Sequence, residues 1–173
     1  GSELGVVDSQ STDGTAKIAK KNGARVFERP WTNFADQKNF GIRQASFPWI
    51  LSLDADERLS PGLREEILAL KAVEPDCAGF SVCRRVFYLG RWIRHSGWYP
   101  DRRVRLFRRD RARGEGEFVH ESLAVDGKIE KIAGAVTHLT YNGIPYKVDP
   151  VPYNNLTLPT TVLMTLSVVA TSY

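Results

Sequence analysis

The sequence predicts an α/β domain in which a mostly parallel sheet is flanked by helices and followed by a β-rich second half. Over residues 4–70, short apolar runs alternate with stretches of helical spacing, which is the order of β-α-β units. After Pro75 the chain changes to runs rich in Val, Phe, Tyr and Cys, which favour strands. With 173 residues, 42% of them hydrophobic, the chain can bury one sizeable core.

The first half of the chain predicts three strand and helix pairs in order. Leu4–Val7 is a short apolar run that ends at Asp8, and the turn and capping residues that follow predict a helix start. Gly23 is a helix stop, and Pro61 suits the first turn of a helix. We therefore expect strands over 4–7, 24–27 and 49–53, and helices over 16–22, 35–45 and 61–70.

The second half predicts further strands and a tail of different character. Residues 79–83, 86–88 and 103–107 favour strands, and Val125–Ile129 predicts a hairpin turn. From Pro145 onward three more prolines interrupt any periodic pattern. We therefore divide the chain into a domain over 3–144 and an atypical tail over 145–173.

Two carboxylates follow the apolar run of residues 49–53. The sequence there is Asp54-Ala55-Asp56-Glu57, so the acids lie at the carboxyl end of a predicted strand. Ligands of open α/β sheets bind at that edge, and paired acids suit a hard divalent cation shared with substrate phosphates. The alternative is a solvated turn that leads into a helix.

The charge pattern indicates an anionic partner. The net charge is +4, and arginines are concentrated in the second half, at positions 84, 85, 91, 94, 102, 103, 105, 108, 109, 111 and 113. Nucleotide phosphates, a phosphorylated glycolipid and an anionic membrane surface all fit this charge. Because the sequence has no zinc-finger spacing and no RNP-like motif, we do not expect a nucleic acid.

The cysteines, histidines and apolar runs limit the expected redox state, metal binding and membrane contact of the chain. Cys77 and Cys83 form no disulfide framework, so we expect reduced thiols of an intracellular protein. His95, His120 and His138 lack the spacing of a zinc site. The apolar run over 162–170 is too short to span a bilayer, so membrane contact would be peripheral or belong to sequence outside this chain.

Several motifs follow one another in a specific order. Val6–Thr15, Gln37-Lys38-Asn39 and Trp49–Glu57 together resemble family 2 glycosyltransferases. His95–Asp101, Arg105–Arg108 and Val119-His120-Glu121 are similar to the branch of that family typified by lipopolysaccharide core glucosyltransferases. The resemblance covers roughly residues 4–144, and several ordered motifs are far more specific than any one of them.

The resemblance implies a GT-A fold, a Rossmann-like domain that uses a nucleotide-sugar donor, with UDP-hexose as the expected donor, and a divalent Mg²⁺ or Mn²⁺. The implied reaction is an inverting transfer to a saccharide or lipid-linked acceptor of the bacterial envelope, at the cytoplasmic face of the membrane. It also implies that Asp8 contacts the nucleoside, that Asp54 contacts the ribose and that Asp56 holds the metal.

An inverting displacement also needs a base on the acceptor side and positive charge near the leaving diphosphate. We expect Glu121 to be the base, with Asp101 as the second candidate for this role or for binding the acceptor. Lys38 or an arginine of the run 102–109 would neutralise phosphate charge, although such side chains are more often solvated. The stacking candidates are Trp98 and Tyr99, and His120 is expected to orient the base or meet a phosphate; core positions are the alternative for all three.

The chain departs from the family pattern at both ends. Family members begin with an apolar strand and a nucleotide-binding turn that precede the first segment here, so we expect an amino-terminally incomplete domain. The sheet edge left open would invite a partner chain, a swapped element or aggregation. Two alternatives follow: a non-catalytic or inactive module of the same fold, and a metal-dependent nucleotidyl or phosphoryl transferase.

Overall fold

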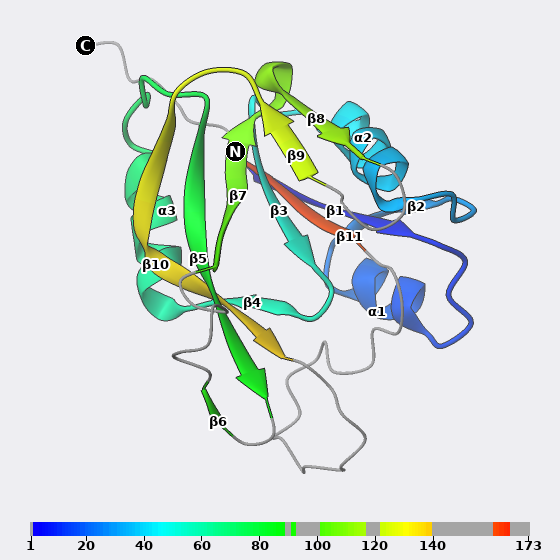
Figure 1. Ribbon diagram of the computed structural model, residues 1–173. Coiled ribbons are helices and arrows are strands. Elements are labelled where there is room, and N and C mark those ends of the chain that lie inside the picture. The colour runs from blue at the N-terminus through cyan, green and yellow to red at the C-terminus, as the bar shows by residue number, and fades with distance from the viewer. Residues whose placement is uncertain (1, 89–90, 93–100, 117–121, 140–160, 167–173) are drawn as a thin grey trace.

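A computed structural model of the protein describes residues 2–88, 91–92, 101–116, 122–139 and 161–166 (Figure 1). Its helices are α1 (Thr15–Lys21), α2 (Phe34–Gln44), α3 (Pro61–Leu70) and a 3₁₀ turn (Arg109–Arg111). Its strands are β1 (Ser2–Asp8), β2 (Arg25–Glu28), β3 (Trp49–Asp54), β4 (Glu57–Leu59), β5 (Gly79–Tyr88), β6 (Arg91–Trp92), β7 (Asp101–Arg108), β8 (Ala112–Glu115), β9 (Ser122–Val125), β10 (Ile129–Leu139) and β11 (Thr161–Leu166).

The predicted elements of the first half are present, within a residue or two at their ends. Their boundaries follow from local chemistry. Asn33 caps α2 by accepting a hydrogen bond from the Asp36 backbone N–H at 2.8 Å. Ser60 caps α3 in the same way through the Leu63 N–H at 3.2 Å, with Pro61 in the first turn.

The main sheet has the strand order β2-β1-β11-β3-β7-β5-β10-β4, with β6 paired to β5, and β8 and β9 form a separate pair. Only β1 with β2 and β5 with β10 run parallel among the described pairs. The α/β class is therefore confirmed, whereas the prediction of a mostly parallel sheet is wrong for the described strands. The reason is that β7 and β11 enter between the other strands in the opposite direction.

The hairpin predicted at Val125–Ile129 is also wrong. A turn with Gly127 at a φ of 125° joins β9 to β10, but these two strands do not pair with each other. β9 pairs with β8, and β10 pairs with β5 and β4. The turn signal is local, whereas the pairing partners come from distant parts of the chain.

The core lies on both faces of the main sheet. Ile50 and Leu51 are neighbours in β3 and are fully buried on opposite faces. Ile50 packs in a cluster with Ile42 of α2 and Phe107 of β7. Leu51 packs in another cluster with Leu63 of α3, so α2 and α3 cover opposite faces (Figure 1).

β11 lies between β1 and β3 and is antiparallel to both. β1 is therefore paired on both sides, and the open edge expected beside it is not found there. In the described part of the chain that edge is filled by β11 of the same chain, which is none of the three outcomes expected. The sheet instead ends at β2 and β4. The division of the chain at residues 144 and 145 stays a prediction.

The position of β11 also determines where the carboxyl ends of β1 and β3 lie. Since β11 is antiparallel to both neighbours, β1 and β3 run in the same direction. Thr161 pairs with Val7 on one side and with Asp54 on the other. The carboxyl ends of β1 and β3, which carry Asp8 and Asp54, thus meet at one edge of the sheet.

Candidate functional site

Asp8 is the acid at the end of β1, and its side chain is held from within the following turn. The residue is only 1% exposed. One carboxylate oxygen accepts the Ser11 backbone N–H at 3.0 Å, and the other accepts the Ser11 hydroxyl at 2.5 Å. Ser11 thereby fixes the orientation of the carboxylate at the carboxyl edge of the sheet.

Asp54–Glu57 form a tight connection between β3 and β4. The Asp54 backbone N–H donates to Glu57 Oε2 at 3.0 Å, which closes the turn. Asp56 lies in this turn with a side chain that is 51% exposed. The sequence did not predict β4, a short strand between the acids and α3, which pairs with β10.

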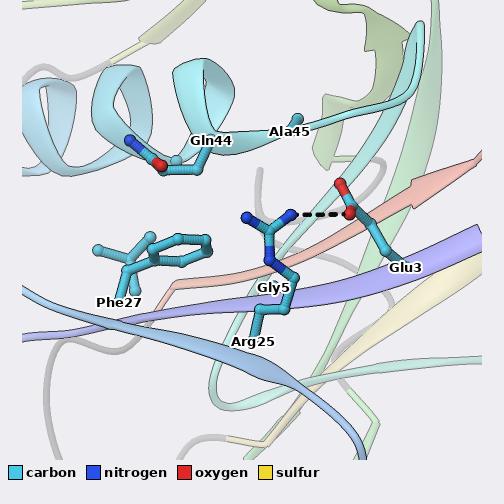
Figure 2. Close-up of a pocket in the computed structure, with 8 residues that line it drawn as sticks. Glu3, Gly5, Arg25, Phe27, Gln44 and Ala45 are labelled. Carbon is cyan, nitrogen blue, oxygen red and sulfur yellow. Dashed lines mark hydrogen bonds and ion pairs between the residues drawn. The ribbon is translucent and has the colours of Figure 1, made fainter.

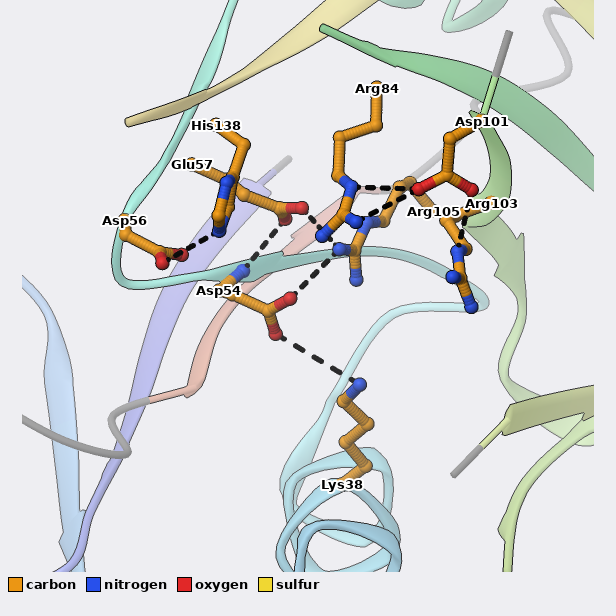
Figure 3. A network of polar contacts seen from close by, with 9 residues as sticks. All are labelled: Lys38, Asp54, Asp56, Glu57, Arg84, Asp101, Arg103, Arg105 and His138. Carbon is orange, nitrogen blue, oxygen red and sulfur yellow. Dashed lines mark hydrogen bonds and ion pairs between the residues drawn. The ribbon is translucent and has the colours of Figure 1, made fainter. Parts of the chain in front are cut away.

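Two cations approach the carboxylate of Asp54 (Figure 3). Arg105 Nη2 lies 2.8 Å from Asp54 Oδ2, and the same nitrogen forms an ion pair with Glu57 Oε1. Lys38 Nζ, from α2, lies 3.9 Å from Asp54 Oδ1. The structure therefore brings two of the predicted site residues, Lys38 and Asp54, together and adds Arg105, which the sequence singled out only as one of a run of arginines.

The shared guanidinium sets the ionisation of the two acids. Burial opposes the charge on Asp54, but Arg105, with Lys38 and Arg84, holds the pKa of this carboxyl below its usual range. Burial, together with the negative charge of Asp54, raises the pKa of Glu57 against the effect of Arg105. Burial also disfavours the charge on Arg105, but the two carboxylates raise its pKa.

His138 is the functional candidate that sequence reasoning missed. Its Nε2 lies 2.9 Å from Asp56 Oδ2 (Figure 3). The contact follows from the pairing of β10 with β4, in which His138 lies opposite Glu57. No spacing in the sequence signals it, because the two residues lie far apart along the chain.

The donor set at the turn suits a divalent cation that is completed by a substrate. Within the described ranges, no cluster of three or more His, Cys, Asp or Glu side chains could hold a metal ion alone. Asp56 offers a carboxylate that is 51% exposed, and His138 offers an imidazole that is 20% exposed. Mg²⁺ is commonly bound through one or two carboxylates with substrate phosphates and water, so these residues fit a metal shared with a nucleotide diphosphate.

Asp101, the second candidate for the base, lies at the start of β7. Its two carboxylate oxygens face different arginines: Oδ2 lies 2.9 Å from Arg84, and Oδ1 lies 2.9 Å from Arg103. Arg84 also contributes to the field at Asp54, so Asp101 belongs to the same polar network (Figure 3). The other predicted residues of the acceptor side, Trp98, Tyr99, His120 and Glu121, lie outside the described residues.

A shallow hollow beneath the end of α2 is separate from these acids. Its charged lining residues, Glu3 and Arg25, pair with each other at 3.0 Å near the amino ends of β1 and β2 (Figure 2). Gly5, Phe27 and Gln44 supply part of the remaining lining. Because its two charges neutralise each other, the hollow offers no net charge that would attract a nucleotide phosphate.

Two further expectations concern the cysteines and the membrane. Cys77 and Cys83 are buried free thiols, and burial raises the pKa of Cys77. This agrees with the expected reduced state. None of the helices in the described ranges is both long and apolar enough to cross a membrane.

Comparison with known proteins places these features in a family. Residues 2–123 match the model of glycosyl transferase family 2. The chain is 35% identical over 133 residues to the lipopolysaccharide core biosynthesis glycosyltransferase LpsC of Rhizobium meliloti (strain 1021), an alignment that covers 73% of this chain and 49% of that protein. It is 48% identical over 65 residues to an uncharacterized glycosyltransferase of Rickettsia conorii, covering 38% of this chain and 23% of that protein.

The chain thus spans about half the length of the Rhizobium protein and less of the Rickettsia one. The family match covers Asp8, Lys38 and the turn of Asp54 and Asp56, which the fold gathers at one sheet edge. On the strength of the family model and the Rhizobium relative, the chain belongs to glycosyl transferase family 2, which implies the GT-A fold.

Proposed function

We propose that the chain carries the donor site of an inverting, metal-dependent glycosyltransferase. The donor would be a nucleotide-sugar, most simply a UDP-hexose. The observation that carries this proposal is the placement of Asp54 and Asp56 at the carboxyl end of β3, on the same edge as Asp8. That edge is where α/β sheets bind nucleotides.

Each donor-side residue has a role that fits its surroundings. Asp8, fixed by Ser11, would accept a hydrogen bond from the nucleoside. Asp54 would accept one from the ribose, and Asp56 with His138 would hold the metal. Lys38, one-fifth exposed and 3.9 Å from Asp54, would face the diphosphate. The bound metal would supply Lewis-acid stabilisation of the charge that develops on the leaving diphosphate.

The acceptor side rests on residues of the predicted motifs. Glu121 would take the proton of the attacking hydroxyl, with His120 beside it in sequence and Trp98 and Tyr99 stacking on the acceptor sugar. Both oxygens of Asp101 are engaged by arginines, which favours an acceptor-binding or structural role for it over that of a base.

The acceptor class is proposed from similarity and charge. The Rhizobium relative is named for lipopolysaccharide core biosynthesis. A saccharide or lipid-linked acceptor of the bacterial envelope would suit the arginine-rich second half of the chain, which would also attract an anionic membrane from the cytoplasmic side.

A second candidate is a non-catalytic or inactive module of the same fold. It is favoured by the antiparallel insertion of β11 between β1 and β3, which places a tail segment at the centre of the nucleotide edge. Such a module would keep the fold and the basic surface without turning over a donor.

The test is calorimetric titration of the chain with UDP in Mn²⁺, repeated in EDTA and with Asp56→Ala. Binding that requires Mn²⁺ and disappears in the variant would support the donor site, and transfer from UDP-sugars would then exclude the inactive module. UDP binding that is unchanged by EDTA, or that is retained in Asp56→Ala, would refute the metal assignment. Products that retain the sugar on phosphate would indicate a nucleotidyl or phosphoryl transferase instead.

A further inference from the structure

We propose that Arg105 is a positioning residue of the β3–β4 turn. By pairing with Asp54 and Glu57, it keeps these two acids from the metal, so that Asp56 and His138 bind it. This inference deepens the proposed function and rests on it. Arg105, on β7, would thus determine which acid of the β3–β4 turn contacts the nucleotide and which acid binds the cation.

The contacts show how Arg105 binds the turn. Its Nη2 contacts Asp54 Oδ2 at 2.8 Å and pairs with Glu57 Oε1, while Glu57 Oε2 accepts the Asp54 backbone N–H at 3.0 Å. Asp54 and Glu57 are thus joined twice, once through the backbone and once through the guanidinium. Figure 3 shows the Asp56 carboxylate paired with His138 and not with the guanidinium of Arg105.

Burial strengthens the ion pairs of Arg105 with the two acids. The side chain of Arg105 is 9% exposed and that of Glu57 is fully buried. Ion pairs that are shielded from water are screened little, and an acid left there without its partner carries a large desolvation penalty. Arg105 therefore offsets the desolvation of the two carboxylates, Asp54 and Glu57, that lie on either side of Asp56 in the sequence.

The charge balance explains why this matters for the metal. Lys38 and Arg105 carry two positive charges, and the acids Asp54, Asp56 and Glu57 carry three negative ones, which leaves about one negative charge for an incoming cation. Without Arg105, the carboxylate of Asp54, which is 36% exposed, would lose its 2.8 Å partner and would attract the cation itself. The metal would then bind more tightly without nucleotide, but Asp54 would no longer be held for the ribose.

The nitrogen that Arg105 uses for its acid contacts suggests a variant for testing this inference. Among the described residues, no group accepts a hydrogen bond from its buried Nε, so Nη2 makes both acid contacts. A lysine ammonium at this position would restore the charge through a single nitrogen. Arg105→Lys should therefore rescue part of what Arg105→Met loses.

The experiment measures Mn²⁺ affinity alone and UDP affinity in saturating Mn²⁺, by electron paramagnetic resonance and calorimetry. Arg105→Met should bind Mn²⁺ about tenfold more tightly and UDP about tenfold more weakly, each a change of about 1.4 kcal/mol. Arg105→Lys should lie between this variant and wild type. Arg25→Met is the matched control, because it breaks the 3.0 Å pair with Glu3 at the other end of the sheet and should change neither affinity.

Arg105→Met leaves the buried Glu57 without its cation, so the double variant Arg105→Met/Glu57→Gln is measured beside it. Glutamine keeps an oxygen for the Asp54 N–H while removing the buried charge. Opposite changes in the two affinities in either folded variant support the inference. Parallel losses, or no change, in folded protein overturn it. Failure of wild type to bind Mn²⁺ and UDP would instead refute the proposed function itself.

Discussion

Replacing Gly134 by alanine is expected to destabilise the protein through one contact between β10 and α3. A Cβ at Gly134 would lie 2.6 Å from the backbone N and 2.7 Å from the Cβ of Leu63. Non-bonded carbon atoms in contact are separated by about 3.5–4.0 Å, so α3 would have to move away by roughly 1 Å. Leu63 is fully buried, and its displacement would disturb the core on that face of the sheet.

The helix is not free to move. Glu66 of α3 accepts the backbone N–H groups of Ala133 at 3.1 Å and Gly134 at 2.9 Å, and the Ser60 hydroxyl accepts that of Ala135 at 3.2 Å. Overpacking costs about 1–3 kcal/mol, and each weakened hydrogen bond adds up to about 1 kcal/mol. We expect a loss of about 3 kcal/mol, which corresponds to a fall in Tm of about 6–12 °C for a chain of this size.

The assay is urea unfolding followed by circular dichroism, with Gly62→Ala as the control. Gly62 lies in the first turn of the same helix, and a Cβ there would meet nothing within 4 Å. That variant should be neutral or more stable by up to about 1 kcal/mol, because alanine favours the helix. A loss below about 1 kcal/mol for Gly134→Ala at unchanged m would refute the described packing of α3 on β10.

Of three further predictions, two concern the site and one concerns the contact of α2 with β8. Burial opposes the charge of Asp54, yet Arg105 and Lys38 hold its pKa below 3.8, so the stability from this charge is complete above pH 3.8 and disappears as pH falls through the lowered pKa. Unfolding free energies of wild type and Asp54→Asn should therefore converge below pH 3.8, and a constant difference would contradict this. Asn39→Ala should cost about 2 kcal/mol in chemical denaturation, because Asn39 exchanges hydrogen bonds of 2.8 and 3.0 Å with the Gly114 backbone. His138→Ala should weaken Mn²⁺ binding at least about tenfold in a titration of the folded variant, and an unchanged affinity would remove His138 as a ligand.

The sequence alone predicted the local elements of the first half and the position of the acids. Capping side chains, Pro61 and the apolar run of residues 49–53 act within a few residues, so the strand that ends at Asp54 and the helix that begins at Pro61 could be placed from pattern. The motifs that surround them were specific enough to indicate the family that the comparisons show.

The direction and neighbours of the strands could not be predicted in this way. A strand shows its periodicity but not its partner, since pairing depends on contacts between segments far apart in the chain. The antiparallel β11 between β1 and β3, and the separation of β9 from β10, are decided at that level. The same holds for the charges that serve the site: Arg105 and His138 reach Asp54 and Asp56 only because β7 lies beside β3, and β10 beside β4, in the folded sheet.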